Sequence, residues 1–126
     1  MNIYVTHSKK FNFHEDLYKP LRSSPLNVNH QFFLPHEFND EPYDSKNLIF
    51  NKGCDLIIAE ISYPSTGQGI ELGWSDVFHI PIVCVYMTGA KISSSLTVVS
   101  HDFIEYGSPV DLISKLSEYI NAHAQA

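Results

Sequence analysis

Short apolar runs alternate along the chain with segments of helical spacing. The runs are rich in β-branched and aromatic residues, have the length of strands, and occupy positions 2–6, 31–34, 55–61, 81–86 and 101–105. Between most of them, apolar residues recur every three or four positions, as on one face of a helix; such segments begin near positions 12, 44, 70 and 108. The Ser-rich stretch 91–99 predicts a short helix or an irregular crossover.

Local signals mark the ends of one short helix in the middle of the chain. Asp44 or Ser45 is suited to cap a helix that runs to Phe50, because both side chains can accept a hydrogen bond from a backbone N–H. Gly53 then supplies the C-terminal stop, since glycine adopts a left-handed backbone conformation readily. The helix therefore leads directly into the apolar run 55–61.

The alternation of strand and helix predicts a three-layer α/β domain. Runs 55–61 and 81–86 are apolar throughout, as expected for parallel strands that are covered on both faces. We expect one doubly wound domain over residues 1–126, flavodoxin-like or Rossmann-like, with a parallel five-stranded sheet. Ligands of such sheets bind at the carboxyl ends of the strands, where the sequence places Ser8, His36 and the segment 65–71.

Composition excludes several classes of partner. The chain has 8 Lys and Arg against 14 Asp and Glu, a net charge of −6 without a basic cluster, which argues against nucleic acid or an anionic membrane. We expect no leader, because no charged-then-apolar segment precedes Ile3, and no membrane span, because no apolar run approaches the needed length. Cys54 and Cys84 are expected as reduced core thiols. We expect a soluble cytoplasmic protein without cofactor or metal, because no two histidines have metal-site spacing.

The segment 64–69, Pro-Ser-Thr-Gly-Gln-Gly, predicts a tight loop after the central strand. Gly67 and Gly69 permit positive φ and a close approach of the backbone to a ligand. The loop leads into a helix predicted over 70–78, whose free N–H groups favour an anion, and Ser65 adds a hydroxyl donor. An ordinary capped turn would have the same composition. Neither a dinucleotide fingerprint nor a P-loop motif is present.

Glu71 is the candidate reactive group. The predicted helix 70–78 places its carboxylate in the first turn, where the helix dipole stabilises the charge. An ionised, fixed carboxylate is suited to attack an anomeric carbon or to stabilise an oxocarbenium-like transition state. A first-turn glutamate with a purely structural role fits the same pattern.

The run from Pro64 to Gly73, with the apolar strand before it, resembles the nucleoside 2-deoxyribosyltransferase superfamily. The resemblance is closest to its 2'-deoxynucleoside 5'-phosphate N-hydrolases. In that family the glutamate of Glu-Leu-Gly attacks C1' of the sugar and displaces the base, a role that falls on Glu71. The hydrolases carry a phosphate-binding serine six residues earlier, where this chain has Ser65, whereas the transferases carry an acidic residue there.

The resemblance implies further site residues. The family's N-terminal strand and loop, with a tyrosine and two phosphate-binding residues, match Tyr4, Ser8 and Lys10. A serine after the fourth strand reaches the phosphate of the neighbouring subunit in the family; Ser93 is its counterpart, which implies a homodimer. Trp74, directly after Glu-Leu-Gly, fits the core, the base pocket or the dimer face.

Two departures from the family pattern affect the chemistry. The family's N-terminal loop contains glycine, whereas this chain has His7, which would be basic if protonated. An ungapped alignment puts Asn47 where the family has an aspartate that orients the nucleophile and helps to protonate the leaving base. Asp44, one helical turn earlier, is the first alternative acid, although it is also the candidate cap. The others are His36 and Glu37.

Three functions follow as hypotheses. The first is hydrolysis, or transfer, of the N-glycosidic bond of a (deoxy)nucleoside 5'-monophosphate. The second is a nucleotide-binding or signalling module that has lost turnover, which Asn47 favours. The third is a nucleoside 2-deoxyribosyltransferase, which Ser65 disfavours. In each case the partner is a small nucleoside or nucleotide.

Overall fold

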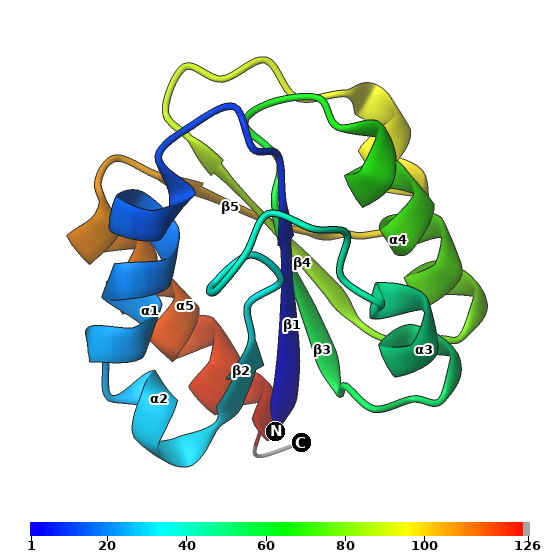
Figure 1. Ribbon diagram of the computed structural model, residues 1–126. Coiled ribbons are helices and arrows are strands. Elements are labelled where there is room, and N and C mark those ends of the chain that lie inside the picture. Colours follow the sequence, from blue (N-terminus) through cyan, green and yellow to red (C-terminus); the bar gives the residue numbers. More distant parts are fainter. Residues whose placement is uncertain (125–126) are drawn as a thin grey trace.

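Five parallel strands form the central sheet of the computed structural model, which describes residues 1–124. The strands lie in the order β2-β1-β3-β4-β5, so the order reverses beside β1 (Figure 1). Their bounds are Asn2–His7 for β1, Gln31–Phe33 for β2, Leu56–Glu60 for β3, Ile82–Met87 for β4 and Asp102–Tyr106 for β5. All four pairings are parallel. The predicted fold class is confirmed.

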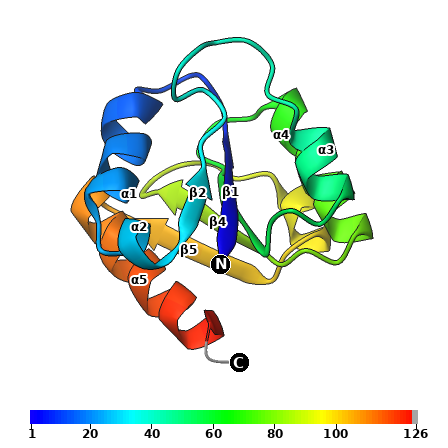
Figure 2. The same ribbon diagram turned by 60° about the horizontal axis from the view of Figure 1, so that its bottom comes forward.

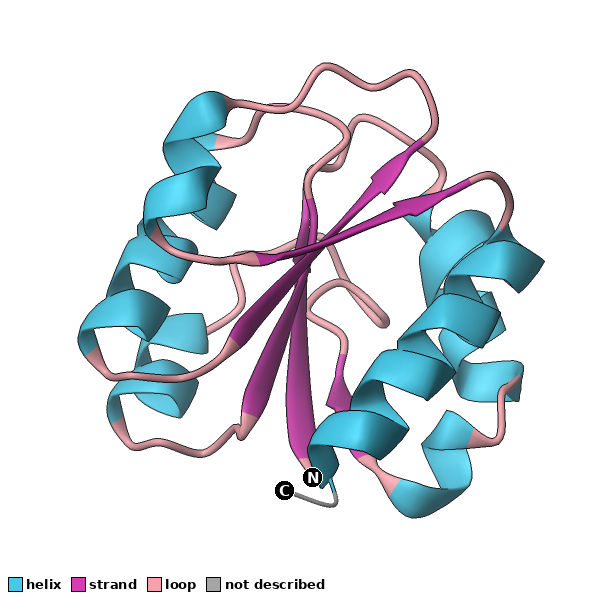
Figure 3. Ribbon diagram, turned by 180° about the vertical axis from the view of Figure 1, so that it is seen from behind, coloured by secondary structure: helices cyan, strands magenta, loops and turns pink. Residues whose placement is uncertain are grey.

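Helices cover both faces of the sheet (Figure 3). A π-helical turn η1 (His14–Tyr18) and helices α1 (Lys19–Ser23), α2 (Leu26–Asn29) and α5 (Pro109–Ala124) cover one face. Helices α3 (Ser45–Phe50) and α4 (Thr66–Val77) and the 3₁₀ turn η2 (Ser94–Val98) cover the other. Alternate β1 residues therefore enter different cores: Ile3 and Val5 pack toward α1 and α5, and Tyr4 packs toward α3 and α4.

The stop signal of α3 differs from the prediction. Asp44 caps the helix by accepting the N–H of Asn47, as predicted for one of its two candidate caps. The left-handed residue after the helix is Lys52, with φ of 52°, rather than Gly53. A Cβ on Gly53 would lie 2.8 Å from Leu48 Cδ1 and 3.3 Å from the Leu48 carbonyl, so a larger residue would require the Leu48 side chain to shift.

Helix α4 begins four residues earlier than predicted. Ser65 is its N-cap and accepts the N–H of Gln68, so Gly67 and Gly69 belong to the first turn. Neither glycine has positive φ, which corrects that expectation; a Cβ on either would meet nothing within 4 Å. Glu71 consequently lies in the second turn, not the first. The helix dipole therefore stabilises its negative charge less than expected.

Candidate active site

Two hydroxyl groups of β1 hold the Glu71 carboxylate. Tyr4 and Thr6 lie two residues apart on the strand, so both side chains face α4. Tyr4 Oη donates to Glu71 Oε2 at 2.7 Å, and Thr6 Oγ1 donates to Oε1 at 2.6 Å. Burial, and then the nearby charge of Glu71, raise the pKa of Tyr4, which therefore remains a donor. The carboxylate is fixed at both oxygens.

The first turn of α4 provides a place for an anion. The Ser65 cap uses the N–H of Gln68, and the N–H of Gly69 donates to the Ser65 carbonyl. In the described part of the chain, the N–H groups of Thr66 and Gly67 have no protein acceptor. Such free N–H groups at a helix start favour phosphate or carboxylate. The open space beside Gly67 leaves room for a ligand to approach them.

A cavity of about 700 Å³ joins the carboxylate to this turn. Its walls come from the loops after β1, β2 and β3, and the long loop between β2 and α3 arches over the same end of the sheet (Figure 2). The structure thus brings together nine of the residues predicted for the site; they are Tyr4, His7, Ser8, Lys10, His36, Ser65, Gly67, Glu71 and Trp74.

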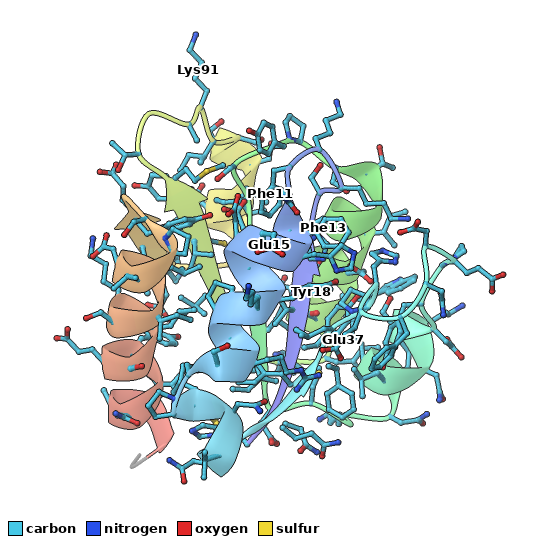
Figure 4. All side chains as sticks on the ribbon, turned by 60° about the vertical axis from the view of Figure 1, so that its left-hand side comes forward. Phe11, Phe13, Glu15, Tyr18, Glu37 and Lys91 are labelled. Carbon is cyan, nitrogen blue, oxygen red and sulfur yellow. The ribbon has the colours of Figure 1, made fainter. Side chains whose placement is uncertain are left out.

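Four predicted site residues lie outside this lining. The Asp44 carboxylate caps α3, and the Asn47 side chain pairs with Asn51 on the exposed side of that helix. Gly69 and Ser93 line a second cavity, of about 420 Å³, on the other side of the first turn of α4. Lys91, which also lines it, lies on the connection between β4 and β5 and points away from the body of the protein (Figure 4).

The pKa of both histidines predicted for the site is lowered, although among the residues that the structure describes only the ring of His7 has hydrogen-bond partners at both nitrogens. His7 Nδ1 faces the Ser8 carbonyl and must donate to it, so Nε2 accepts from Tyr18 Oη at 2.6 Å. Burial lowers the pKa of His7 to about 4, so this ring adds no positive charge to the loop at neutral pH. Burial and the charge of Lys9 lower the pKa of His36. Glu37 pairs with Arg22, with 2.8 Å between charged atoms, and is absent from the described cavity lining.

Sequence reasoning missed several residues of the cavity. Thr6 was recognisable, because a residue two positions from Tyr4 on a strand shares its face. Gln68 was also recognisable, since it completes a Ser-x-x-Gln capping signal with Ser65. No pattern indicated Asp40 and Tyr43, which belong to the loop after β2; Tyr43 stacks on Tyr4 with 5.8 Å between ring centroids. Lys9 Nζ donates to the Asp40 carbonyl and joins this loop to the loop after β1.

A second carboxylate lies on the other side of the turn between β3 and α4. Glu60 is completely buried and accepts from the N–H and hydroxyl of Ser62 and from Tyr106 Oη. Ser62 Oγ also accepts the N–H of Met87. Burial raises the pKa of Glu60 against the opposing effect of these hydrogen bonds. The group does not reach the 700 Å³ cavity.

Among residues 1–124, no group of three or more metal-ligating side chains comes together. Within the same range, no helix has the length and hydropathy needed to cross a membrane. The described cavity lining is instead polar and aromatic, with Lys9, Lys10 and the hydroxyl residues near α4. Such a lining suits a small polar ligand that carries an anionic group.

Comparisons with known proteins find similarity to proteins that are named for the cleavage of nucleotides. No protein-family model matches the chain. It is 41% identical over 45 residues to the "Putative 2'-deoxynucleoside 5'-phosphate N-hydrolase 1" of Syntrophotalea carbinolica, which is 36% of this chain and 32% of that protein. It is 42% identical over 40 residues to the protein of the same name from Methanosarcina barkeri, which is 32% of this chain and 25% of that protein.

The structure of the CMP N-glycosidase BcmB from Clostridium botulinum shares the fold. Its TM-score is 0.62 at 22% identity, over 93% of this chain and 99% of that one. The sequence matches span about a third or less of the curated proteins. Together, these similarities support the resemblance to the nucleoside 2-deoxyribosyltransferase superfamily that the run from Pro64 to Gly73 carries.

Proposed function

We propose that this protein is an N-glycosidase that hydrolyses a (deoxy)nucleoside 5'-monophosphate to free base and sugar phosphate. The observation that carries the proposal is the Glu71 carboxylate, which two hydroxyl donors fix at the wall of a cavity. The names of the similar proteins, two N-hydrolases of deoxynucleoside phosphates and a CMP N-glycosidase, support this bond type.

In the proposed reaction, a Glu71 oxygen attacks C1' from the face opposite the base. The C1'–O bond forms while the C1'–N bond breaks, and the base leaves with the electron pair of that bond. Water then attacks C1', gives a proton to the group that protonated the departing base, and releases Glu71 as a carboxylate. Tyr4 and Thr6 keep the carboxylate oriented through both steps.

The departing base needs a proton. Asp44 and Asn47 lie outside the cavity lining, whereas His36 and Asp40 belong to it. We assign the proton to Asp40, because it and Glu71 are the two carboxyl residues in the described lining. The contact between Lys9 and the Asp40 carbonyl holds its loop at the cavity.

The phosphate is proposed to bind at the first turn of α4. Ser65, the free N–H groups after it, Ser8 and Lys10 all line this part of the molecule. Lysine acts there as a point charge. Ser93 lies in the second cavity, across that turn, and its contact with the phosphate of a neighbouring subunit remains a proposal that requires a homodimer. Sedimentation of the protein with and without nucleotide measures that state.

A panel of deoxynucleoside and nucleoside 5'-monophosphates, with chromatography of the released base, tests the function. We expect base release from at least one nucleotide and none with Glu71→Ala. No release from any member of the panel would contradict the proposal.

Binding without turnover is the second candidate, because the acid expected at position 47 is an asparagine outside the lining. Calorimetry that shows saturable nucleotide binding without base release, unchanged in Glu71→Gln, supports this alternative. A base-exchange assay with two nucleosides tests the third hypothesis, a transferase.

A further inference from the structure

Thr6 has a buried hydroxyl that donates a hydrogen bond to Glu71, the proposed nucleophile. The residue is 1% exposed, and its Oγ1 donates to Glu71 Oε1 at 2.6 Å. A hydroxyl has one proton, and burying it without a partner is costly. Packing alone would be satisfied by valine, which has nearly the same shape. The polar atom at this position therefore acts on Glu71.

Gln68 fixes the backbone of Thr6 from the other side. Its side chain is 5% exposed, and Nε2 donates to the carbonyls of Thr6, at 3.2 Å, and Glu60, at 2.8 Å. These carbonyls lie near the carboxyl ends of β1 and β3, which pair through Thr6–Ala59 and His7–Glu60. Gln68 thus joins α4 to both strands at the carboxyl end of the sheet, where the cavity lies.

The contacts form a closed circuit between α4 and β1. Gln68 and Glu71 are three residues apart, on neighbouring positions of one helix face. Gln68 contacts the main chain of Thr6, and the side chain of Thr6 contacts Glu71. Threonine is β-branched, so its side-chain torsion is restricted once the backbone is fixed. The backbone of β1 therefore fixes the position of the Thr6 hydroxyl, and the hydroxyl in turn fixes Glu71 Oε1.

We propose that Thr6 is a positioning residue, which sets the rotation of the Glu71 carboxylate for attack on C1', and that Gln68 positions Thr6. The inference rests on the proposed N-glycosidase function and adds two residues to it. Tyr4 alone holds one oxygen and leaves the carboxylate free to turn about its Cγ–Cδ bond. The Thr6 hydroxyl on the second oxygen prevents that rotation.

The first test compares Thr6→Val with Thr6→Ser on the nucleotide that the wild type hydrolyses fastest. We expect Thr6→Val to lower kcat by about 10- to 100-fold, with KM changed less than about threefold, because misorientation penalises the chemical step. Thr6→Ser keeps the hydroxyl and should restore kcat to within about fivefold of the wild type. The control is Thr97→Val, since Thr97 is exposed and donates to the Ser94 carbonyl in η2.

A double-mutant cycle with Gln68→Leu tests the second step. If Gln68 acts through Thr6, the double variant is no slower than Thr6→Val by more than about threefold, instead of the product of the two losses. Full multiplication of the two effects overturns the assignment of Gln68. The threonine variants decide the role of Thr6 even where Gln68→Leu fails to fold.

Crystal structures of the threonine variants give a readout that does not depend on turnover. The Glu71 carboxylate should rotate out of its wild-type plane in Thr6→Val and keep that plane in Thr6→Ser. An unmoved carboxylate in Thr6→Val, or equal kcat losses in the two variants, overturns the inference. Absence of base release by the wild type instead contradicts the proposed function, so the two failures are distinguishable.

Discussion

Glu71 and Glu60 flank the same turn between β3 and α4, and similar donors hold them. Glu71 accepts from Tyr4 and Thr6, whereas Glu60 accepts from Tyr106 and Ser62. Glu71 faces a cavity of about 700 Å³, while Glu60 is completely buried near the ends of β4 and β5. Hydrogen bonding alone therefore does not identify a reactive carboxylate. The two carboxylates differ in whether a substrate can reach them, because only Glu71 belongs to the described lining of the cavity.

Removing each carboxylate should produce the largest difference between them. Glu71→Gln is expected to lower the rate of base release by about 10⁴-fold or more, because an amide is a poor nucleophile. Glu60→Gln should keep the rate within about fivefold of the wild type, since Glu60 does not touch the cavity. Chromatography of released base measures both, and circular dichroism verifies folding. Equal losses in two folded variants would remove the distinction.

The proposed acid allows the comparison to be extended along the reaction. Asp40→Asn should slow the release of ordinary bases by about 10²- to 10⁴-fold. An N7-methylated guanine leaves without added protonation, so hydrolysis of the nucleotide that carries it should be slowed far less by Asp40→Asn. Glu41→Gln is the matched control, because Glu41 belongs to the same loop and is absent from the described lining. Equal losses on the two kinds of substrate would exclude Asp40 as the proton donor.

The tyrosines should separate the same two roles. Tyr4→Phe removes one donor from Glu71 and is expected to lower kcat by about 10- to 100-fold with a small change in stability. Tyr106→Phe removes a donor from buried Glu60 and should cost about 1–3 kcal/mol in the free energy of unfolding with kcat nearly unchanged. Steady-state kinetics and urea unfolding measure the two effects. A reversed pattern contradicts the assignment of roles.

The pH dependence of stability should report Glu60. Because burial raises its pKa in the folded state, the protonated group stabilises the fold at a pH below its unfolded pKa of about 4.3. That contribution is lost as pH rises through the folded pKa, at about 1.4 kcal/mol for each unit of elevation. Urea unfolding between pH 4 and pH 8 should show the wild type losing stability relative to Glu60→Gln. A relative gain would contradict the raised pKa.

The fold could be predicted almost completely from the sequence, because each strand is a separate apolar run. Predicted residues that line the cavity include Ser8, which follows a strand, and Glu71 of the α4 motif, whereas Tyr4 was named from the family resemblance. The start of α4 was placed too late because Gly67 and Gly69 are weak helix formers. The cap at Ser65 and the packing of α4 on the sheet outweigh that preference.

The residues that were missed depend on long-range placement. No local pattern shows that Thr6 lies opposite Glu71, because this contact depends on where α4 packs along the strands of the sheet. Asp40 belongs to a long polar loop without periodicity, whose path depends on its contacts with β1 and with the loop after β1. Asn47 aligns with the family's aspartate in sequence, but the structure directs its side chain to Asn51. Alignment gives the position along the chain, not the direction of the side chain.

The circuit around Glu71 has a consequence for how the protein folds. Its contacts join residues 67, 65 and 62 positions apart in sequence, so no local segment contains the site. Closing such loops loses chain entropy before any contact compensates, and it slows folding. Catalytic activity should therefore return only once β1 has paired with β3 and α4 has packed on both strands, so recovered activity reports that these long-range contacts have formed.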